Sequence, residues 1–284
     1  MTKGDLDHFF NPSSIAVVGA SRKRDSLGNL IVRNLIEQGF SGSIYPVNPK
    51  SEKVAGLKCY KDVAALPAAP DLSVIAIPAR FVPQEISKEA SLGVRNAIIV
   101  SAGFKEIGAE GKKLEDEVKQ TARRKKVRVL GPNCLGIYDN VSKIDTFFVP
   151  RNFVKRPSFG GVSLASQSGS FIGHVMDIAA FENLGIARVV TYGNQADVNE
   201  EDALVYFEGD SFTKVVGLYI EAVRDGKAFV KAARRCAKKK PVIVLKTGRS
   251  DSMSQAVTSH TGAIAGQYSS YKSAFQSADL KEVF

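Results

Sequence analysis

The stretch that decides the fold is Ile15-Ala16-Val17-Val18-Gly19-Ala20-Ser21, which is followed by Gly28. Its consecutive apolar residues predict a strand buried on both faces, as in a parallel sheet covered by helices. Glycine directly after the strand, and again at the start of the next helix, lets the backbone approach a phosphate at a helix N-terminus. The stretch therefore predicts the first strand and the ligand-binding loop of a Rossmann-like unit.

Apolar, β-branched runs alternate with amphipathic segments along the rest of the first half of the chain. This alternation is typical of an α/β fold with a parallel sheet. We predict strands at 15–19, 43–47, 72–77, 97–101 and 127–130, and helices near 28–38, 82–92 and 110–124.

The pattern changes after Asn133, where residues 136–160 include Pro150 and Pro157 and show no helical period. We interpret this stretch as a loop-rich domain boundary. A second doubly wound α/β unit follows, so we predict two domains, 1–140 and 141–284. Its strands are expected at 161–165, 187–192, 215–220 and 242–246, and its helices at 170–181, 200–208, 227–238 and 262–277.

The composition is that of a globular protein, with 284 residues of which 44% are hydrophobic and 24% charged. The 39 Lys and Arg residues outnumber the 29 Asp and Glu residues, and the net charge of +10 favours phosphorylated ligands or an acidic partner. The basic clusters at 123–126 and 238–240 contain no aromatic residues, so no nucleic-acid partner is expected.

Membrane, metal and disulfide signals are missing from the sequence. No apolar run approaches the roughly 18 residues of a membrane span, so no membrane association is expected. Cys59, Cys134 and Cys236 are far apart, with no CxxC pair, which argues against a zinc site and a disulfide framework. We expect a cytoplasmic protein without a bound metal in this chain.

A phosphorylated nucleotide is the ligand expected for the first domain. Lys50 follows the second strand, where a dinucleotide site usually has an acidic residue. A lysine there could pair with a phosphate on the ribose, as in coenzyme A or, less readily, NADP. Ser101-Ala102-Gly103 and Asn133 follow later strands, whose carboxyl ends meet at the same edge of the sheet. Each of these loops could also be an ordinary turn that binds no ligand.

A phosphate-binding site is predicted where the strand 161–165 runs into Ser166-Gln167-Ser168-Gly169 and a helix. Hydroxyl groups and free backbone N–H groups meet the positive end of a helix dipole there. The alternative is a nucleophile elbow with Ser168 as the nucleophile, but its G-x-S-x-G pattern fails because serines flank Ser168 in place of both glycines.

His260 is the candidate catalytic residue, because it stands in Ser259-His260-Thr261-Gly262-Ala263 just before the last predicted helix. A phosphoryl group on its ring could be stabilised by two helix N-termini, with Gly262 at the second of them. Glu221, at the end of a predicted strand, could accept the other ring N–H. The alternative is a loop histidine without a role. His174, inside an apolar predicted helix, and His8, on the N-terminal arm, are interpreted as structural or surface residues.

These motifs resemble the acyl-CoA synthetases of the NDP-forming type, which include the α subunits of succinyl-CoA synthetase and of ADP-forming acetyl-CoA synthetase. The resemblance is carried by 16–21, 45–50, 131–134, 166–169 and 259–263, in that order. It implies a CoA-binding Rossmann-like domain and a flavodoxin-like ligase domain. It also implies that the first-domain loops hold CoA, that His260 is transiently phosphorylated, and that Glu221 supports it.

The resemblance has two departures. Gly173 stands where the succinyl enzymes have a tyrosine that contacts the substrate, so acetate or another small carboxylic acid is expected in place of succinate. The sequence shows no P-loop or nucleotide-grasp region. We therefore expect an ATP-grasp β subunit or fused domain to supply ADP or ATP and Mg²⁺, and the end at Phe284 suggests a longer polypeptide.

Two other functions remain open from the sequence. One is a CoA-binding regulatory module without chemistry, like the related domain fused to protein acetyltransferases. The other is an NADP-dependent oxidoreductase.

Overall fold

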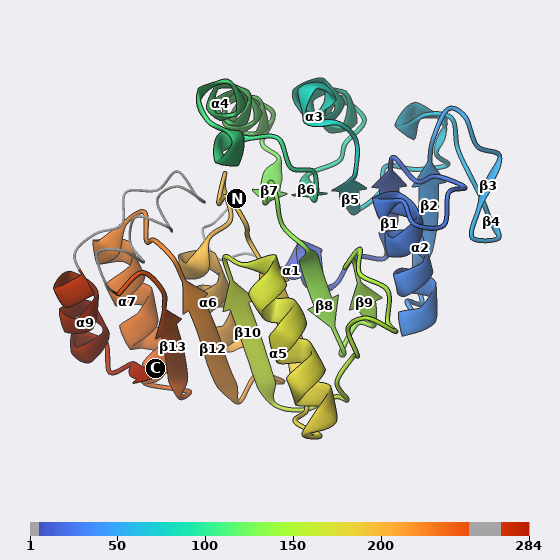
Figure 1. Ribbon diagram of the computed structural model, residues 1–284. Helices are drawn as coiled ribbons and strands as arrows, with labels where there is room; N and C mark the ends of the chain where they lie inside the picture. The colour runs from blue at the N-terminus through green and yellow to red at the C-terminus, as the bar shows by residue number, and fades with distance from the viewer. Residues whose placement is uncertain (1–5, 250–267, 284) are drawn as a thin grey trace.

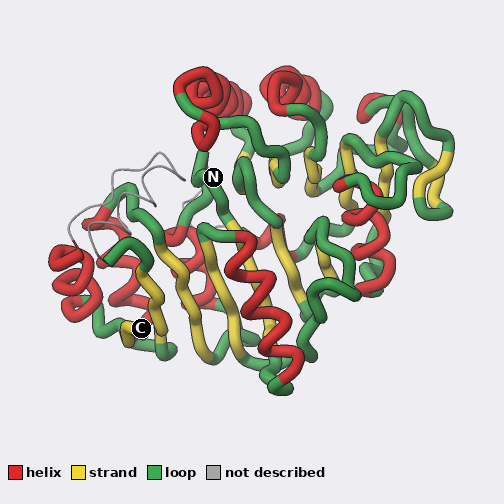
Figure 2. The backbone as a smooth tube through the Cα atoms, in the orientation of Figure 1, coloured by secondary structure: helices red, strands yellow, loops and turns green. Residues whose placement is uncertain are grey.

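The computed structural model describes residues 6–249 and 268–283, which form two α/β units side by side (Figure 1). Each unit is built around one main sheet with helices on its faces (Figure 2). The largest cluster of buried apolar residues contains side chains from both units, including Val17 and Ile98 of the first and Val216 and Phe229 of the second. The two units are therefore packed against each other through part of the core.

The first sheet is parallel throughout, with the strand order β2-β1-β5-β6-β7. The chain passes from β1 to β2 on one side and then crosses to β5 on the other, which makes the carboxyl ends of β1 and β5 the switch point of the sheet. The prediction of a Rossmann-like unit is confirmed. The elements are β1 (Ser14–Val18), α2 (Leu27–Gln38), β2 (Ser43–Val47), β5 (Leu72–Ile75), α3 (Val82–Ser91), β6 (Asn96–Ile99), α4 (Ala109–Lys125) and β7 (Arg128–Leu130).

The second sheet has the order β14-β13-β12-β10-β11-β8-β9, and β10 to β14 are parallel. Here the chain reverses direction across the sheet between β10 and β12, as in flavodoxin-like folds. The elements are β10 (Val162–Ser166), α5 (Gly169–Phe181), β11 (Ile186–Thr191), α6 (Glu200–Gly209), β12 (Val215–Ile220), α7 (Gly226–Ala237), β13 (Val242–Lys246), α9 (Tyr268–Ser277) and β14 (Lys281–Val283).

Short elements complete the described chain, and most of them were not predicted. They are α1 (Asp7–Phe10), the hairpin β3 (Lys53–Val54) and β4 (Leu57–Lys58), and the single 3₁₀ turns Val63–Ala65, Ala79–Phe81 and Lys105–Ile107. The strands and helices that were predicted begin and end within one or two residues of the observed bounds. The exception is the last helix, whose predicted first residues lie outside the described part.

Residues 136–160, predicted to be loop-rich, also contain two short strands that were not predicted. β8 (Gly136–Asp139) pairs antiparallel with β11, and β9 (Ile144–Asp145) pairs with β8. β8 is buried along its whole length, and its Asp139 is compatible with burial because Arg188 Nη1 donates to it at 2.5 Å. A buried charge needs such a partner, and the partner lies 49 residues away in sequence. The division at 140/141 stays a prediction, although the second sheet already includes β8.

Backbone hydrogen bonds join the two units. Asn194, Ala196 and Val198 donate to the carbonyls of Pro132, Gly131 and Val129 at 2.9, 2.8 and 3.0 Å. Gly193 makes this approach possible, because a Cβ there would lie only 2.3 Å from the carbonyl oxygen of Asn133. The loop after β11 is thus fixed against the end of β7.

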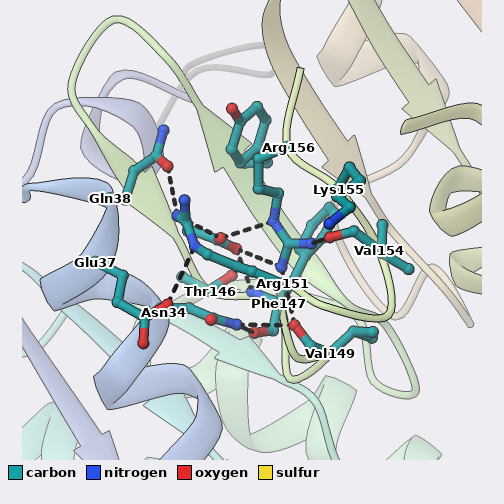
Figure 3. A network of polar contacts seen from close by, with 12 residues as sticks. Asn34, Glu37, Gln38, Thr146, Phe147, Val149, Arg151, Val154, Lys155 and Arg156 are labelled. Carbon is teal, nitrogen blue, oxygen red and sulfur yellow. Dashed lines mark hydrogen bonds and ion pairs between the residues drawn. The ribbon is translucent and has the colours of Figure 1, made fainter. Parts of the chain in front are cut away.

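A second junction between the units is a polar network that includes Arg151 and Arg156 (Figure 3). Arg156 Nε and Arg151 Nη2 donate to the Asp145 carboxylate at 2.8 and 3.0 Å, and Arg151 Nη2 also donates to Gln38 of α2 at 2.5 Å. Asn34 of the same helix donates to the carbonyls of Phe147 and Val149. The segment after β9 is therefore held against a helix of the first unit.

Candidate functional site

A cavity of about 730 Å³ lies where the two units meet, at the carboxyl ends of β10 and β12. This is the switch point of the second sheet, where ligands of open α/β folds bind. The loops after β10, β11 and β12 line it, and the first unit contributes Lys105 and residues 133–135. Its volume falls within the roughly 300–1,000 Å³ typical of small-molecule sites.

The predicted phosphate-binding loop leads into α5, and the N-terminus of this helix lies at the cavity. Ser168 is the N-cap of α5, and its side chain accepts a hydrogen bond from Phe171 N at 3.3 Å. Ser166 is buried, and its hydroxyl accepts from Ser168 N at 3.0 Å and donates to Ser168 O at 2.9 Å. Gly169, at the first position of the helix, packs closely on Leu135, since a Cβ would lie 2.9 Å from Leu135 Cγ. These contacts fix a helix N-terminus at the wall of the cavity, which suits an anion.

Glu221 lines the same cavity and is 7% exposed. Gln167 holds the loop that carries it, because Gln167 Oε1 accepts from the backbone N–H groups of Glu221 and Ala222 at 2.5 and 3.0 Å. The sequence motif includes Gln167, but it does not predict that this side chain holds the loop of Glu221. The structure brings Ser168, Gly169 and Glu221 together, as expected for loops that follow neighbouring strands.

Lys246, at the end of β13, is a buried cation that the sequence prediction missed. It pairs in register with Ile220, directly before Glu221, and its Nζ lies 4.5 Å from the centre of the Tyr271 ring. Burial lowers the pKa of Lys246 to about 8, and the negative charge of Glu221 opposes this shift. The signal in the sequence was the position of Lys246 as the last residue of a predicted strand, at the edge of the sheet where ligands bind.

Two cations, Lys105 and Arg224, line the cavity from opposite units, and the sequence prediction missed both. Lys105 Nζ donates to Asn194 O at 2.6 Å, and Arg224 Nη1 donates to Gln195 O at 2.6 Å. Burial lowers the pKa of Lys105, and the charge of Arg224 adds to this effect, whereas Glu115 opposes it. Both cations contact carbonyls of one loop, and Lys105 also pairs with the buried Glu115 at 4.0 Å.

The loop after β1 lies at the switch point of the first sheet, where the predicted nucleotide site is. Gly19 has φ +91°, and a Cβ there would lie 2.3 Å from the carbonyl oxygen of Ala76 at the end of β5. Ala20 is fully buried, and Ser21 O accepts from Asn29 Nδ2 of α2 at 2.6 Å. A Cβ on Gly28 would lie 2.5 Å from Gly19 O, so strand end, loop and helix start are in close contact.

The other residues predicted to bind the first-domain ligand lie at the same edge of the sheet, with different environments. Lys50 is exposed, and its N–H donates to Asn48 Oδ1 at 2.8 Å. Ser101 is buried, and its hydroxyl donates to Ile77 O at 2.5 Å, whereas Ala102 is exposed and Gly103 has φ +107°. Asn133 N donates to Ser101 O at 3.0 Å, and Asn133 lines the cavity.

Asp197 and Cys134, near the candidate site, make contacts that hold the fold together. Asp197 accepts from Arg128 Nε at 2.7 Å and Val129 N at 3.0 Å, so it joins the two units. Burial raises the pKa of Cys134 to about 12, which fits a packed thiol. His260 and Gly262 lie outside the described residues. Within 6–249 and 268–283, no cluster of three His, Cys, Asp or Glu could hold a metal, and no helix is long and apolar enough to span a membrane.

Glu200, at the start of α6, is expected to make stability depend on pH. It is fully buried, its carboxyl oxygens have no hydrogen-bond partner in the described chain, and burial raises its pKa to about 7. An unfolded chain releases this proton near pH ~4.3. Between these values only the folded state keeps the proton, so stability falls as pH rises through this window and is constant above it.

Glu200→Gln should therefore be more stable than the parent protein by up to about 3 kcal/mol at pH 8, with a smaller difference at pH 5. Urea unfolding at the two pH values measures this. Glu110→Gln is the control, since Glu110 is on the surface with a side chain 85% exposed. An equal gain for Glu200→Gln at both pH values would contradict the assignment.

Comparisons with known proteins give consistent matches to both halves. The CoA binding domain matches residues 13–140, and the succinyl-CoA ligase like flavodoxin domain matches residues 159–283. The ADP-forming acetate–CoA ligase of Methanocaldococcus jannaschii is 41% identical over 276 residues, which cover 97% of this chain and 38% of that protein. The α subunit of the ADP-forming acetate–CoA ligase I of Pyrococcus furiosus is 39% identical over 98% of this chain and 60% of that subunit.

A solved structure agrees with these relatives. The dinucleotide forming acetyl-coenzyme A synthetase 1 of Ca. Korarchaeum cryptofilum, in complex with phosphate and ADP, superposes with a TM-score of 0.93 at 38% identity. The match covers 99% of this chain and 60% of that one. The chain thus spans between 38% and 60% of the length of these relatives.

Proposed function

We propose that this chain is the α-type catalytic part of an NDP-forming acyl-CoA synthetase. The chain belongs to this family through both of its matched domains. The complete enzyme would convert an acyl-CoA, phosphate and ADP to the free acid, CoA and ATP. The observation that carries this proposal is one cavity between the two units that holds both the N-terminus of α5 and Glu221. The domain division would be 1–140 for CoA binding and 141–284 for phosphoryl transfer.

The first step is acyl transfer to phosphate. A phosphate oxygen attacks the thioester carbonyl carbon, the C–S bond breaks, and CoA leaves as a thiolate that takes up a proton. The N-terminus of α5 at Gly169, with the dipole of this helix, would hold the phosphate, and Lys105 and Arg224 would add positive charge nearby. The product is an acyl phosphate at the start of α5.

The second step uses His260 as the nucleophile. A ring nitrogen attacks phosphorus, the P–O bond to the acyl group breaks, and the carboxylic acid leaves. Glu221 would accept the N–H of the other ring nitrogen and so orient the ring and stabilise its charge. Ser168, Gly169 and Gly262 would bind the phosphoryl group. An oxygen of the ADP β-phosphate then attacks phosphorus, which gives ATP and restores the imidazole.

CoA would bind at the carboxyl edge of the first sheet. Gly19, Ala20 and Ser21 would face the pyrophosphate at the start of α2, where the tight contact of Gly19 and Gly28 leaves backbone groups at the ligand surface. The Ser101–Gly103 loop and Asn133 would lead the pantetheine arm to the cavity. We further propose an ATP-grasp β subunit or fused domain that holds the nucleotide and Mg²⁺. The three free, buried cysteines are consistent with a cytoplasmic location.

Phosphoenzyme formation tests the function. The chain incubated with an acyl-CoA and labelled phosphate should acquire an acid-labile, alkali-stable label, and adding ADP with the nucleotide-binding partner should remove it. Calorimetry with CoA is the companion measurement. Tight CoA binding without any label would favour the regulatory module, and NADPH binding without CoA binding would favour the oxidoreductase.

Lys50 provides a test of the ligand. If it pairs with the ribose 3′-phosphate, Lys50→Ala should weaken CoA binding about tenfold, because a charge-assisted hydrogen bond contributes about 1.5–3 kcal/mol. Binding of dephospho-CoA, which lacks that phosphate, should not change. Calorimetry measures both, and Lys53→Ala on the adjacent hairpin is the matched control. Equal weakening for the two ligands would argue against this role.

A further inference from the structure

Asn194, in the loop after β11, connects the cavity to the loop 101–104 of the first unit, which contains three of the residues proposed to bind CoA. Asn194 lines the cavity and is 6% exposed. Its Nδ2 donates to Glu106 Oε2 at 2.6 Å and to Glu115 Oε2 at 2.9 Å. Its Oδ1 accepts from Asn133 Nδ2 at 3.4 Å. Every polar atom of this side chain therefore contacts the first unit.

Glu106 connects Asn194 to the backbone of the loop 101–104. Its Oε1 accepts from the N–H groups of Gly103 at 2.6 Å and Phe104 at 3.0 Å, whereas Oε2 accepts from Asn194. Burial would raise the pKa of Glu106, but the hydrogen bonds from these three residues outweigh it and lower the pKa. Glu106 is thus a carboxylate at neutral pH, and hydrogen bonds to a carboxylate are stronger than those between neutral groups.

The loop 101–104 is therefore held in one conformation by protein groups. Two of its N–H groups are bonded to Glu106, and Gly103 has φ +107°, which glycine adopts without strain. Phe104 is fully buried and packs in the core of the first unit. A loop that is already ordered can bind a ligand without the cost of ordering it.

The backbone of Asn194 makes a second set of contacts with the first unit. Its N–H donates to Pro132 O at 2.9 Å, and its carbonyl accepts from Lys105 Nζ at 2.6 Å. Lys105 and Glu106 are adjacent, so one turn of the first unit contacts both the backbone and the side chain of Asn194. The contact with Pro132 does not need the side chain, so the two units stay joined here when the side chain is removed.

Acyl transfer requires that the thioester and the phosphate lie close together. Reacting atoms must be about 3–3.5 Å apart, and a displacement of about 1 Å can reduce the rate about 100-fold. In the proposed reaction, loops of the first unit bind CoA, and the N-terminus of α5 in the second unit binds phosphate. The loop 101–104 must therefore keep a fixed position relative to the second unit.

We infer that Asn194 and Glu106 are positioning residues of this reaction. Glu106 sets the conformation of the loop 101–104, and Asn194 fixes that loop, with the bound thioester, relative to the phosphate site. The inference rests on the proposed function. Both residues act through the loop, without contact with the reacting atoms.

Asn194→Ala should separate the rate of the reaction from the affinity for CoA. The rate of labelling from phosphate at saturating acyl-CoA should fall about 10- to 100-fold, because the thioester is no longer fixed relative to the phosphate. The affinity for CoA, measured by calorimetry, should stay close to the parent value, because Glu106 still holds Gly103 and Phe104. A contact that only stabilises the fold would change neither quantity in the folded protein.

Glu106→Gln should reduce both quantities. A glutamine amide has one acceptor oxygen and one NH₂ group, so in either orientation the NH₂ group faces a donor, from Asn194 or from Gly103. CoA binding should weaken about tenfold, because the released loop must be ordered when CoA binds. The double variant Glu106→Gln/Asn194→Ala should label no more slowly than the slower single variant, since both changes act through one contact.

Asn140→Ala is the matched control. Asn140 is 7% exposed, donates to the carbonyls of Pro157 and Ile186 at 3.1 and 2.9 Å, and accepts from Gln38 of α2 at 3.1 Å. It joins the two units as Asn194 does, but it is not among the described residues that line the cavity. Its labelling rate and CoA affinity should equal those of the parent protein. Circular dichroism checks that each variant is folded.

An unchanged labelling rate in folded Asn194→Ala would overturn the inference. An equal loss of rate in Asn140→Ala would also overturn it, and so would a double variant slowed by the product of the two single effects. A parent protein that takes up no label would contradict the proposed function instead. Calorimetry with CoA then still tests the pair, because unchanged affinity in Glu106→Gln would show that Glu106 does not set the loop.

Discussion

His260→Ala should abolish phosphoenzyme formation, with a loss of about 10³-fold or more in the rate of labelling from acyl-CoA and phosphate. The reason is that the proposed reaction has no other acceptor for the phosphoryl group, and removal of a covalent nucleophile has effects of this size or larger. The measurement is the incorporation of labelled phosphate into the purified chain. CoA binding should be unchanged, because the loops proposed to hold CoA belong to the first unit.

His8→Ala is the matched control for this experiment, since His8 is exposed on the short helix α1. It should label like the parent protein. Persistence of the alkali-stable label in His260→Ala would contradict the role of His260. Glu221→Gln should give an intermediate result, with slower labelling, because an amide can orient the ring but cannot stabilise its positive charge.

Asp145→Ala should destabilise the protein by about 3–5 kcal/mol, because it leaves two guanidinium groups at a buried site without their carboxylate. Asp145 is fully buried, and the side chain of its partner Arg156 is only 4% exposed. The substitution would also loosen the segment after β9 from α2, since Arg151 bridges Asp145 to Gln38. Urea unfolding followed by circular dichroism measures the change in the free energy of unfolding.

Asp116→Ala is the control for a surface ion pair. Asp116 pairs with Lys112 at 3.0 Å, and its side chain is 41% exposed, so its loss should cost less than about 1 kcal/mol. Asp145→Asn should fall between the two, because the amide keeps an acceptor for one arginine and loses the charge. A similar cost for Asp145→Ala and Asp116→Ala would show that the buried network contributes little to stability.

Strands and helices with a clear period could be predicted from the sequence to within one or two residues. β1 and β12 are apolar throughout or nearly so. The helices α5, α6 and α7 are preceded by Ser168, Asn199 and Asp225, whose side chains cap them. The edge of the sheet where the ligand-binding loops meet also followed from the sequence, because the carboxyl ends of parallel strands lie at the same edge. The local sequence pattern was sufficient to predict an element whose ends are determined by its own residues.

Features that depend on distant partners could not be predicted. β8 contains Asp139, and an aspartate predicts a loop when its partner Arg188 is not known. Lys105 and Arg224 reach one cavity from different units, and nothing in their own neighbourhoods indicates that both contact the loop 194–195. Gln167 was quoted within its motif, yet its contact with the loop of Glu221 spans 54 residues. Such roles arise from tertiary contacts.

The contact between the loop 193–198 and the end of β7 includes three backbone hydrogen bonds and the close approach of Gly193, together with the side chain of Asp197, which accepts from Arg128 and Val129. Backbone groups are the same in every residue except proline, so substitutions in this loop that keep Gly193 and Asp197 leave the junction intact. The cavity walls on α5 and 148–154, in contrast, are made of side chains. This division separates what holds the site together from what selects its ligand. Relatives of this chain could therefore diverge in substrate by changing wall residues, while the geometry between the two units is inherited unchanged.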